Sequence, residues 1–251
     1  MKISFFTMGK DELNYFLKEC LLSAQDIVDE IIYIDTGSTD GSVEWVVDNI
    51  PNAKVYNYPW PGWEQSNKVR NFAIEKCSGD YILTIDADEV FGKSAKKIRE
   101  ILEKYPETES FHLQGEHYMF DLIHQDKSVK THLWQNRLFK NLSHLKYPEN
   151  QHGLVQPESC LSLFGDFIHH YGHCKNMSLA LRRYDENAGD KNEWPEEHKQ
   201  SREDYLKWQL YCMMTGSYPM KKCSLENHPE IIQKKFHIPE IKLWVEKNVK
   251  K

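Results

Sequence analysis

The sequence lacks a paired-cysteine motif and an excess of basic residues. Its six cysteines are scattered without any C-x-x-C pair, which argues against a zinc knuckle or a thioredoxin-type site. The formal net charge of -6 offers no broad basic surface, so nucleic acid is not expected as a partner. At 251 residues the chain is nevertheless long enough to bury a sizeable core.

Membrane-spanning runs and two nucleotide-binding signatures are missing too. No stretch of about eighteen consecutive residues is apolar, and the apolar run at the N-terminus is too short for a signal peptide. We therefore expect a cytoplasmic protein, at most peripheral to a membrane. Neither G-x-G-x-x-G nor G-x-x-x-x-G-K-[ST] occurs, which disfavours dinucleotide oxidation and P-loop phosphate binding.

The first hundred residues contain an alternation of strand and helix patterns. Apolar runs predict strands at 3–8, 30–35, 54–60 and 81–86. Apolar residues with helical spacing predict helices at 13–21, 43–50 and 66–77. Such alternation implies crossover connections and a mostly parallel sheet with helices on both faces.

The pattern changes after about Lys104. Segments 110–120 and 131–141 have the pattern of longer, antiparallel strands, and from Asn176 the chain is charged and helical in pattern. We find no internal repeat and no linker rich in proline or glycine. The sequence therefore predicts one α/β domain over residues 1–175, with a helical C-terminal extension over 176–251 packed on it.

The second predicted strand ends in "IDTGSTDGS". Asp35 can accept hydrogen bonds from a nucleobase or ribose, and Gly37 and Gly41 permit tight turns. An ordinary strand-to-helix turn, in which a side chain from Ser38 to Asp40 caps the next helix, explains the same residues.

The fourth predicted strand ends in "IDADEV". Asp86 and Asp88 are separated by one residue, so both can face one Mg²⁺ or Mn²⁺ ion, which favours hard oxygen ligands. Acids at a helix start are the alternative, and that interpretation applies best to Glu89. Ligands of open α/β sheets bind beyond the carboxyl ends of the strands, where Asp35 and Asp86 both fall.

Four strings in this chain carry a family resemblance. In order they are "DEIIYIDTGSTDGSVEW", "NKVRNFAIEKCSGDYILTIDADEV", "RLFKN" and "HHYGH". Over about Lys2 to Tyr184 the chain resembles family 2 glycosyltransferases with the GT-A fold, in particular the group related to lipopolysaccharide-core glucosyltransferases.

The resemblance implies a fold, an activity and a cofactor. The fold would be the α/β GT-A (nucleotide-diphospho-sugar transferase) fold, with helices flanking a mostly parallel sheet. The activity would be that of an inverting, metal-dependent hexosyltransferase, which moves a sugar from a nucleotide-diphosphate sugar to an acceptor hydroxyl. The expected donor is a UDP-sugar, the cofactor Mn²⁺ or Mg²⁺, and the acceptor a glycan, glycolipid or protein.

The resemblance also implies roles for individual residues. Asp35 is similar to the acid that contacts the nucleotide base, with Thr7 close by in the loop after the first strand. Asp86 is similar to the first acid of the D-x-D motif, near the ribose and the metal, and Asp88 to the direct metal ligand. Arg70 is similar to an arginine near the diphosphate, whose oxygens suit its planar fork.

The catalytic base is where the sequence departs from the family pattern. Relatives often carry V-H-E after the "RLF" strand, whereas this chain has "ENQHGLV" with Gly153 in the position of the glutamate. Glu149 and His152 are the candidates that remain for the base. Turn residues before a strand explain both equally well, and Glu89 is a further candidate.

Histidines and aromatic residues supply the last candidates. By the match to "HHYGH", His170 would be a third metal ligand, whereas a packed histidine cluster, or zinc with Cys174, is the alternative. The aromatic residues Tyr58, Trp60 and Trp63 suit a sugar ring or the core.

Three further hypotheses stay open. The C-terminal segment "KKFHIPEIKLWVEKNVKK" could dock on an anionic membrane, although a solvated helix face explains it too. A sugar-1-phosphate nucleotidyltransferase shares the broad architecture, but "TMGKDE" stands where its glycine-rich loop would be. A non-catalytic module that binds nucleotide sugar or glycan is the third, supported by the missing V-H-E glutamate.

Overall fold

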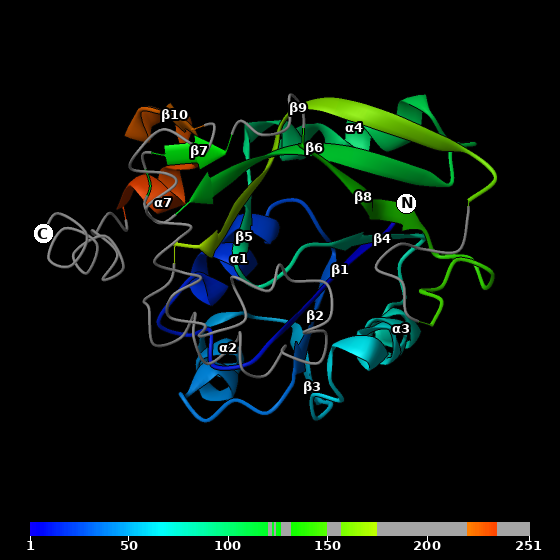
Figure 1. Cartoon of the computed structure of the whole chain (residues 1–251). Coiled ribbons are helices and arrows are strands. Elements are labelled where there is room, and N and C mark those ends of the chain that lie inside the picture. Colours follow the sequence, from blue (N-terminus) through cyan, green and yellow to red (C-terminus); the bar gives the residue numbers. More distant parts are fainter. Residues whose placement is uncertain (120–121, 123, 127–131, 150–156, 175–219, 235–251) are drawn as a thin grey trace, which may run out of the picture. The chain divides into compact units, whose positions relative to one another are not determined.

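The computed structural model describes residues 1–119, 122, 124–126, 132–149, 157–174 and 220–234 (Figure 1). Contacts divide the chain into two compact units, Met1–Glu116 with Thr131–His170 and His117–Lys130 with Tyr171–Lys251. The division at residue 175 and the helical extension stay predictions, because most of 176–251 lies outside the described residues. The same holds for the C-terminal segment considered for a membrane contact.

The first unit is built on a sheet with the strand order β6-β8-β4-β1-β2-β3. The parallel strands are β1 Ile3–Gly9, β2 Glu30–Asp35, β3 Ala53–Asn57 and β4 Tyr81–Thr84. The antiparallel strands are β8 His132–Lys140, which pairs with β4, and β6 Ser110–Met119, which pairs with β8. Beside them, β5 Glu89–Phe91 pairs antiparallel with β9 Cys160–His173. The predicted parallel sheet and the later antiparallel strands are therefore confirmed.

The helices of this unit follow the predicted segments with shifted ends. They are α1 Leu17–Ala24, α2 Ser42–Asn49, α3 Ser66–Lys76 and α4 Ile98–Lys104, with short 3-10 turns η1 Trp63–Gln65 and η2 Lys93–Lys97. The first helix starts later than predicted, because the chain before it turns at Asp11, whose φ is 54°. The N–H of Leu13 there donates to the carboxylate of Asp40 rather than opening a helix.

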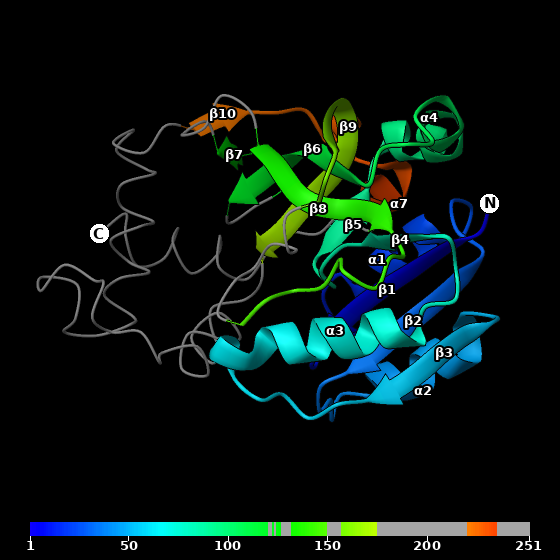
Figure 2. The ribbon, with the colours of Figure 1, turned by 90° about the vertical axis from the view of Figure 1, so that its right-hand side faces the viewer.

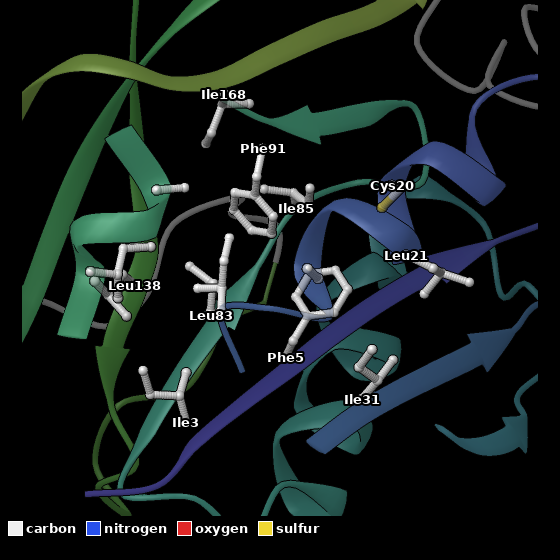
Figure 3. Packing of buried hydrophobic residues seen from close by; sticks show 14 of the residues in the cluster. Ile3, Phe5, Cys20, Leu21, Ile31, Leu83, Ile85, Phe91, Leu138 and Ile168 are labelled. Carbon is white, nitrogen blue, oxygen red and sulfur yellow. The ribbon is translucent and has the colours of Figure 1, made fainter. Parts of the chain in front are cut away.

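The core of this unit lies on both faces of the sheet. Alternate residues of a strand point to opposite faces, so Phe5 and Phe6 of β1 enter different apolar clusters. Phe5 packs with α1, and Figure 3 shows its ring near Phe91, with the two ring centroids 5.7 Å apart. Phe6 packs with α3, which runs along the other face (Figure 2). The predicted helices on both faces are confirmed.

The second unit has a small antiparallel sheet. The end of β6 pairs with β7 His124–Asp126, which pairs with β10 Met220–Lys222, and η5 Leu225–Asn227 and α7 Glu230–Lys234 follow. The buried ring of His228 accepts a hydrogen bond from Tyr171 (2.8 Å) and donates to the carbonyl of Leu122 (2.6 Å). Both ring nitrogens are therefore satisfied inside this unit.

Among the described residues, no helix has both the length and the apolar character needed to cross a membrane.

Candidate active site

The carboxyl ends of three parallel strands meet at one edge of the sheet. In the β1–β2 register Asp35 stands opposite Gly9, and in the β1–β4 register Thr84 stands opposite Phe6, two residues before Asp86. A Cβ placed on Gly9 would lie 3.2 Å from the Cβ of Ala87. The loop after β4 therefore rests against the end of β1, which leaves no room for a larger side chain there.

Two arginines hold the carboxylate of Asp86. Arg70 of α3 donates to Oδ1 at 3.2 Å, and Arg137 of β8 donates to Oδ2 at 3.0 Å. Burial alone would raise the pKa of Asp86, but the charges of Arg137 and Arg70 outweigh it and hold the pKa well below its usual range. Asp86 is thus ionised and Arg70 is paired with it, whereas the expected position of Arg70 near a diphosphate stays a prediction.

Glu89 does not start a helix. The helix-start interpretation was wrong, because the chain continues from Asp88 into strand β5 and the side chain of Glu89 is only 1% exposed. One carboxylate oxygen accepts from the N–H of Asp86 at 2.7 Å and the other from Arg137 at 2.9 Å. Burial, reinforced by the charge of Asp86, raises the pKa of Glu89 to about 8 against the opposing effect of Arg137.

Sequence reasoning missed Arg137. The string "RLFKN" was recognised, but its arginine was given no role. The available signal was an arginine within an apolar strand, where a buried charge must be paired. The partner could not be read from the sequence, since Asp86 lies 51 residues away.

Asp88 and His170 lie together. Their side chains are 13% and 17% exposed, and Nε2 of His170 is 3.8 Å from Oδ1 of Asp88. The pairing of Glu89 with His170 across β5 and β9 produces this closeness. No group of three or more His, Cys, Asp or Glu side chains within the described part of the chain is arranged to hold a metal. Two of the three predicted ligands are therefore neighbours, whereas the third, Asp86, faces arginines.

Comparison with known proteins decides the family. The profile described as Glycosyl transferase family 2 matches residues 11–156, more than half of the chain. The chain belongs to glycosyl transferase family 2. This confirms the family named by the sequence motifs, while the narrower likeness to lipopolysaccharide-core glucosyltransferases stays a prediction.

Curated relatives share part of this family 2 chain. A TPR repeat-containing protein of Synechococcus elongatus is 30% identical over 164 residues, which cover 64% of this chain and 37% of that protein. An uncharacterized glycosyltransferase of Rickettsia bellii is 37% identical over 92 residues, covering 37% and 29%. The chain thus spans about a third of the length of these relatives.

A solved structure shows the same fold. The structure of TarS residues 1–349 from Staphylococcus aureus, in complex with UDP-GlcNAc, matches with a TM-score of 0.52 at 17% identity, covering 67% of this chain and 58% of that one. Together with the family match, this likeness confirms the GT-A fold predicted for the chain.

Asp35 has a local role in this family 2 chain. Its carboxylate accepts hydrogen bonds from the N–H groups of Gly37 and Ser38 and from the amide of Asn57, at 3.1 to 3.3 Å. Asp40 accepts from the N–H of Ser42, the first residue of α2, at 3.0 Å, which supports the turn interpretation, and contact of Asp35 with a nucleotide base stays a prediction. The placement of Thr7 in the loop after the first strand was wrong, because β1 continues to Gly9 and buries Thr7 completely.

The candidate bases have different positions. Glu149 is exposed, two residues after Tyr147, while His152 lies outside the described residues. Asn71 of α3 holds the backbone of Tyr147, accepting from its N–H at 2.9 Å and donating to its carbonyl at 2.8 Å. The ring of Tyr147 has its centroid 5.5 Å from the guanidinium carbon of Arg70. The segment that carries Glu149 is therefore anchored beside the Asp86 cluster.

The remaining candidates are placed in part. Tyr58 packs on Phe72 of α3 with ring centroids 5.1 Å apart, which favours the core interpretation. His169 is buried and bonded to Asp166. The side chain of Trp63 lies outside the described part. The acceptor role of these aromatic residues stays a prediction.

Proposed function

We propose that this chain is an inverting glycosyltransferase that moves a sugar from a nucleotide-diphosphate sugar, with a UDP-sugar as the first candidate, to an acceptor hydroxyl. One observation carries the proposal: two arginines converge on Asp86 at the carboxyl edge of the parallel sheet, next to Asp88 and His170. This edge is where open α/β sheets bind ligands.

The arginines suit a diphosphate leaving group. Breaking the bond between sugar and phosphate builds negative charge on the departing diphosphate, and fixed cations nearby lower the energy of that state. Arg70 and Arg137 are fixed by Asp86, so little reorganisation is needed as the charge develops. The buried Nε of Arg70 has no hydrogen-bond partner in the described part of the chain.

The side chains beside the arginines fit a divalent cation. Asp88 offers a carboxylate, the donor type that Mn²⁺ and Mg²⁺ sites use, and the imidazole of His170, 3.8 Å away, is a donor that suits a transition metal better than Mg²⁺. Asp88 and His170 would hold the ion, with Asp86 behind them positioned by the arginines. When bound, the ion would supply positive charge to the diphosphate oxygens.

The acceptor hydroxyl needs a base. Glu149 is our candidate, because it is exposed to solvent and follows a segment anchored by Asn71. A carboxylate there would take the hydroxyl proton as the new bond forms on the face of the sugar opposite the leaving diphosphate. His152 is the second candidate. Glu89 is not proposed for this role, because its side chain is buried and both oxygens accept hydrogen bonds.

One solved structure supports the choice of donor class, and one curated relative supports sugar transfer. The matching TarS structure contains UDP-GlcNAc, and the chain is 32% identical over 91 residues to the glycosyltransferase SunS of Bacillus phage SPbeta, covering 35% of this chain and 21% of SunS. We propose a glycan, a glycolipid or a protein as the acceptor.

A donor screen tests the proposal. The full chain would be incubated with UDP-, GDP- and dTDP-sugars, with and without Mn²⁺, while nucleotide release and thermal stability are measured. We expect one nucleotide class to raise the melting temperature with Mn²⁺ and to be turned over, since a ligand that binds only the native state stabilises it. Activity unchanged by a chelator would overturn the metal role, and no binding or turnover of any donor would overturn the function.

The same assay separates the two rival hypotheses. When sugar 1-phosphate and a nucleoside triphosphate replace the donor, a nucleotidyltransferase would join the nucleotide to the sugar phosphate, forming nucleotide sugar and releasing pyrophosphate. A non-catalytic module would bind the donor without turning it over on a broad acceptor panel.

A further inference from the structure

Glu89 closes the turn that carries the two aspartates. Its backbone N–H donates to the carbonyl of Asp86 at 2.9 Å, and its side chain accepts from the N–H of Asp86 at 2.7 Å. Residues 86–89 are therefore clamped at both ends by a single residue. Such a clamp fixes the directions in which Asp86 and Asp88 leave the backbone.

The same carboxylate also orients Arg137. The other oxygen of Glu89 accepts from Nη2 of Arg137 at 2.9 Å, and this Nη2 also donates to Asp86 at 3.0 Å. Glu89, Arg137 and Asp86 thus form a closed ring of hydrogen bonds that joins β5, β8 and the loop after β4. The side chain of Arg137 is 11% exposed, so water competes little for these bonds.

Strand β5 connects this ring of hydrogen bonds to the neighbouring pair of Asp88 and His170. Glu89 stands opposite His170 in the β5–β9 register, and the N–H of Phe91 donates to Ser23 of the α1 helix at 3.1 Å. The separation of Asp88 from His170 depends on that register. A shift of Glu89 would therefore move Asp86, Arg137 and the Asp88–His170 pair together.

We infer that Glu89 is a positioning residue, which holds Asp86, Asp88 and Arg137 in the arrangement that receives the nucleotide diphosphate and its divalent cation. It acts through these neighbours, because its buried carboxylate is out of reach of a substrate. This inference rests on the proposed function. In this role Glu89, the third acid of "IDADEV", neither binds the metal nor transfers a proton.

A group with two acceptor oxygens suits this position better than an amide, which has one. Each oxygen of Glu89 faces an N–H donor, one on Asp86 and one on Arg137. Glutamine has one acceptor oxygen and one NH₂ group, so Glu89→Gln would turn a donor toward one of these donors. The volume stays nearly the same, and the substitution therefore tests the hydrogen bonds rather than the packing.

The test compares Glu89→Gln with Glu103→Gln, the same change at an exposed site on α4. In the full chain, we expect Glu89→Gln to raise the Mn²⁺ and UDP concentrations needed for half-saturation by at least about tenfold, the effect typical of residues that support metal ligands. The KM for the acceptor should stay unchanged. Glu103→Gln should match the wild type in every measurement.

A second readout needs neither metal nor donor. Hydrogen exchange in the free protein should be faster in Glu89→Gln for the peptide that contains residues 84–91, with the rest of the first unit unchanged. If Glu89→Gln fails to fold, Arg137→Lys is measured against Arg99→Lys, where Arg99 pairs with Asp29 on the surface. Arg137→Lys should shift Mn²⁺ half-saturation in the same direction.

The outcomes separate this inference from the proposed function. Wild-type turnover together with unchanged half-saturation in a folded Glu89→Gln, or in Arg137→Lys, would overturn the positioning role alone. A wild-type chain that binds no nucleotide and turns over no donor would overturn the function and the inference with it.

Discussion

Two buried glutamates at opposite edges of the same sheet are satisfied in different ways. Glu30 begins β2 at the amino edge and accepts from the N–H and hydroxyl of Ser78 at 2.6 and 2.8 Å and from the hydroxyl of Ser4. Glu89 follows β4 at the carboxyl edge and relies on one backbone N–H and Arg137. The first cluster is complete in itself, whereas the second shares its cation with another acid, Asp86.

The pKa values of Glu30 and Glu89 differ accordingly. Burial raises the pKa of both. At Glu30 the hydrogen bonds from Ser4 and Ser78 outweigh burial and lower the pKa to about 2. At Glu89 burial prevails and the pKa rises to about 8. Glu30 is therefore stabilised as a carboxylate at the amino edge, whereas Glu89 at the carboxyl edge is protonated more easily than an ordinary glutamate.

The largest expected effect is on catalysis at the carboxyl edge. Asp88→Asn should lower kcat/KM for the donor by at least about a thousandfold, because Asp88 is the proposed metal ligand and such a ligand supplies several kcal/mol of transition-state stabilisation. Asp80→Asn is the matched control, since Asp80 precedes the same strand at its amino edge and is exposed. Steady-state kinetics would measure both variants. Retained activity in Asp88→Asn would contradict a catalytic role for the carboxyl edge of the sheet.

Removing the shared cation should destabilise the carboxyl edge most. Arg137→Met leaves Asp86 and Glu89 buried without that cation, so the free energy of unfolding should fall by about 3–5 kcal/mol. Urea denaturation of the ligand-free chain measures this. The double variant Arg137→Met with Glu89→Met should recover part of the loss. A double variant no more stable than the single one would refute the view that the unpaired carboxylate causes the cost.

Glu30→Gln should have a smaller effect that depends on pH. The folded pKa of Glu30, about 2, lies below its ordinary value of 4.5, so its stabilisation is present above pH 4.5 and is lost as the pH falls toward 2. At pH 7 the variant should lose about 1–3 kcal/mol of unfolding free energy. Denaturation between pH 3 and 7 should show the difference from wild type shrinking in acid, with donor turnover unchanged. A difference independent of pH would contradict this.

The smallest effect is expected at the surface of the amino-edge cluster. Lys54 lies 3.1 Å from Glu30, but its side chain is 51% exposed. Lys54→Met should therefore change the unfolding free energy by about 1 kcal/mol or less. Thermal denaturation at low and high salt would measure it. A larger loss would mean that lysines, rather than hydroxyl groups, hold Glu30.

The sequence predicted the sheet better than the contacts within the site. The alternation of apolar runs in the first hundred residues was enough for the parallel strands, because each signal is local. Asp86, Asp88 and Arg70 were also expected together, through motifs that share one strand and one helix. Arg137 was not expected beside them, because its position depends on the pairing of β8 with β4, in which Leu138 stands opposite Leu83.

The environment of Glu89 also could not be predicted from the sequence. Three acids within four residues after an apolar strand are compatible with a helix start, and nothing local excludes that choice. The insertion of β5 beside β9 buries Glu89 and brings Arg137 to it. Strand β9 begins about 70 residues later in the chain, so this pairing leaves no mark on the residues around Glu89.

The sequence by itself determined the periodicities that form strands and helices and the acids that follow the strands. Only the tertiary structure decided which charges meet. Backbone pattern depends on neighbouring residues, whereas the pairing of a buried carboxylate depends on strands that are distant in sequence and close in space. A role for Asp88 can therefore be proposed from its motif, whereas a role for Glu89 can be proposed only from the folded chain.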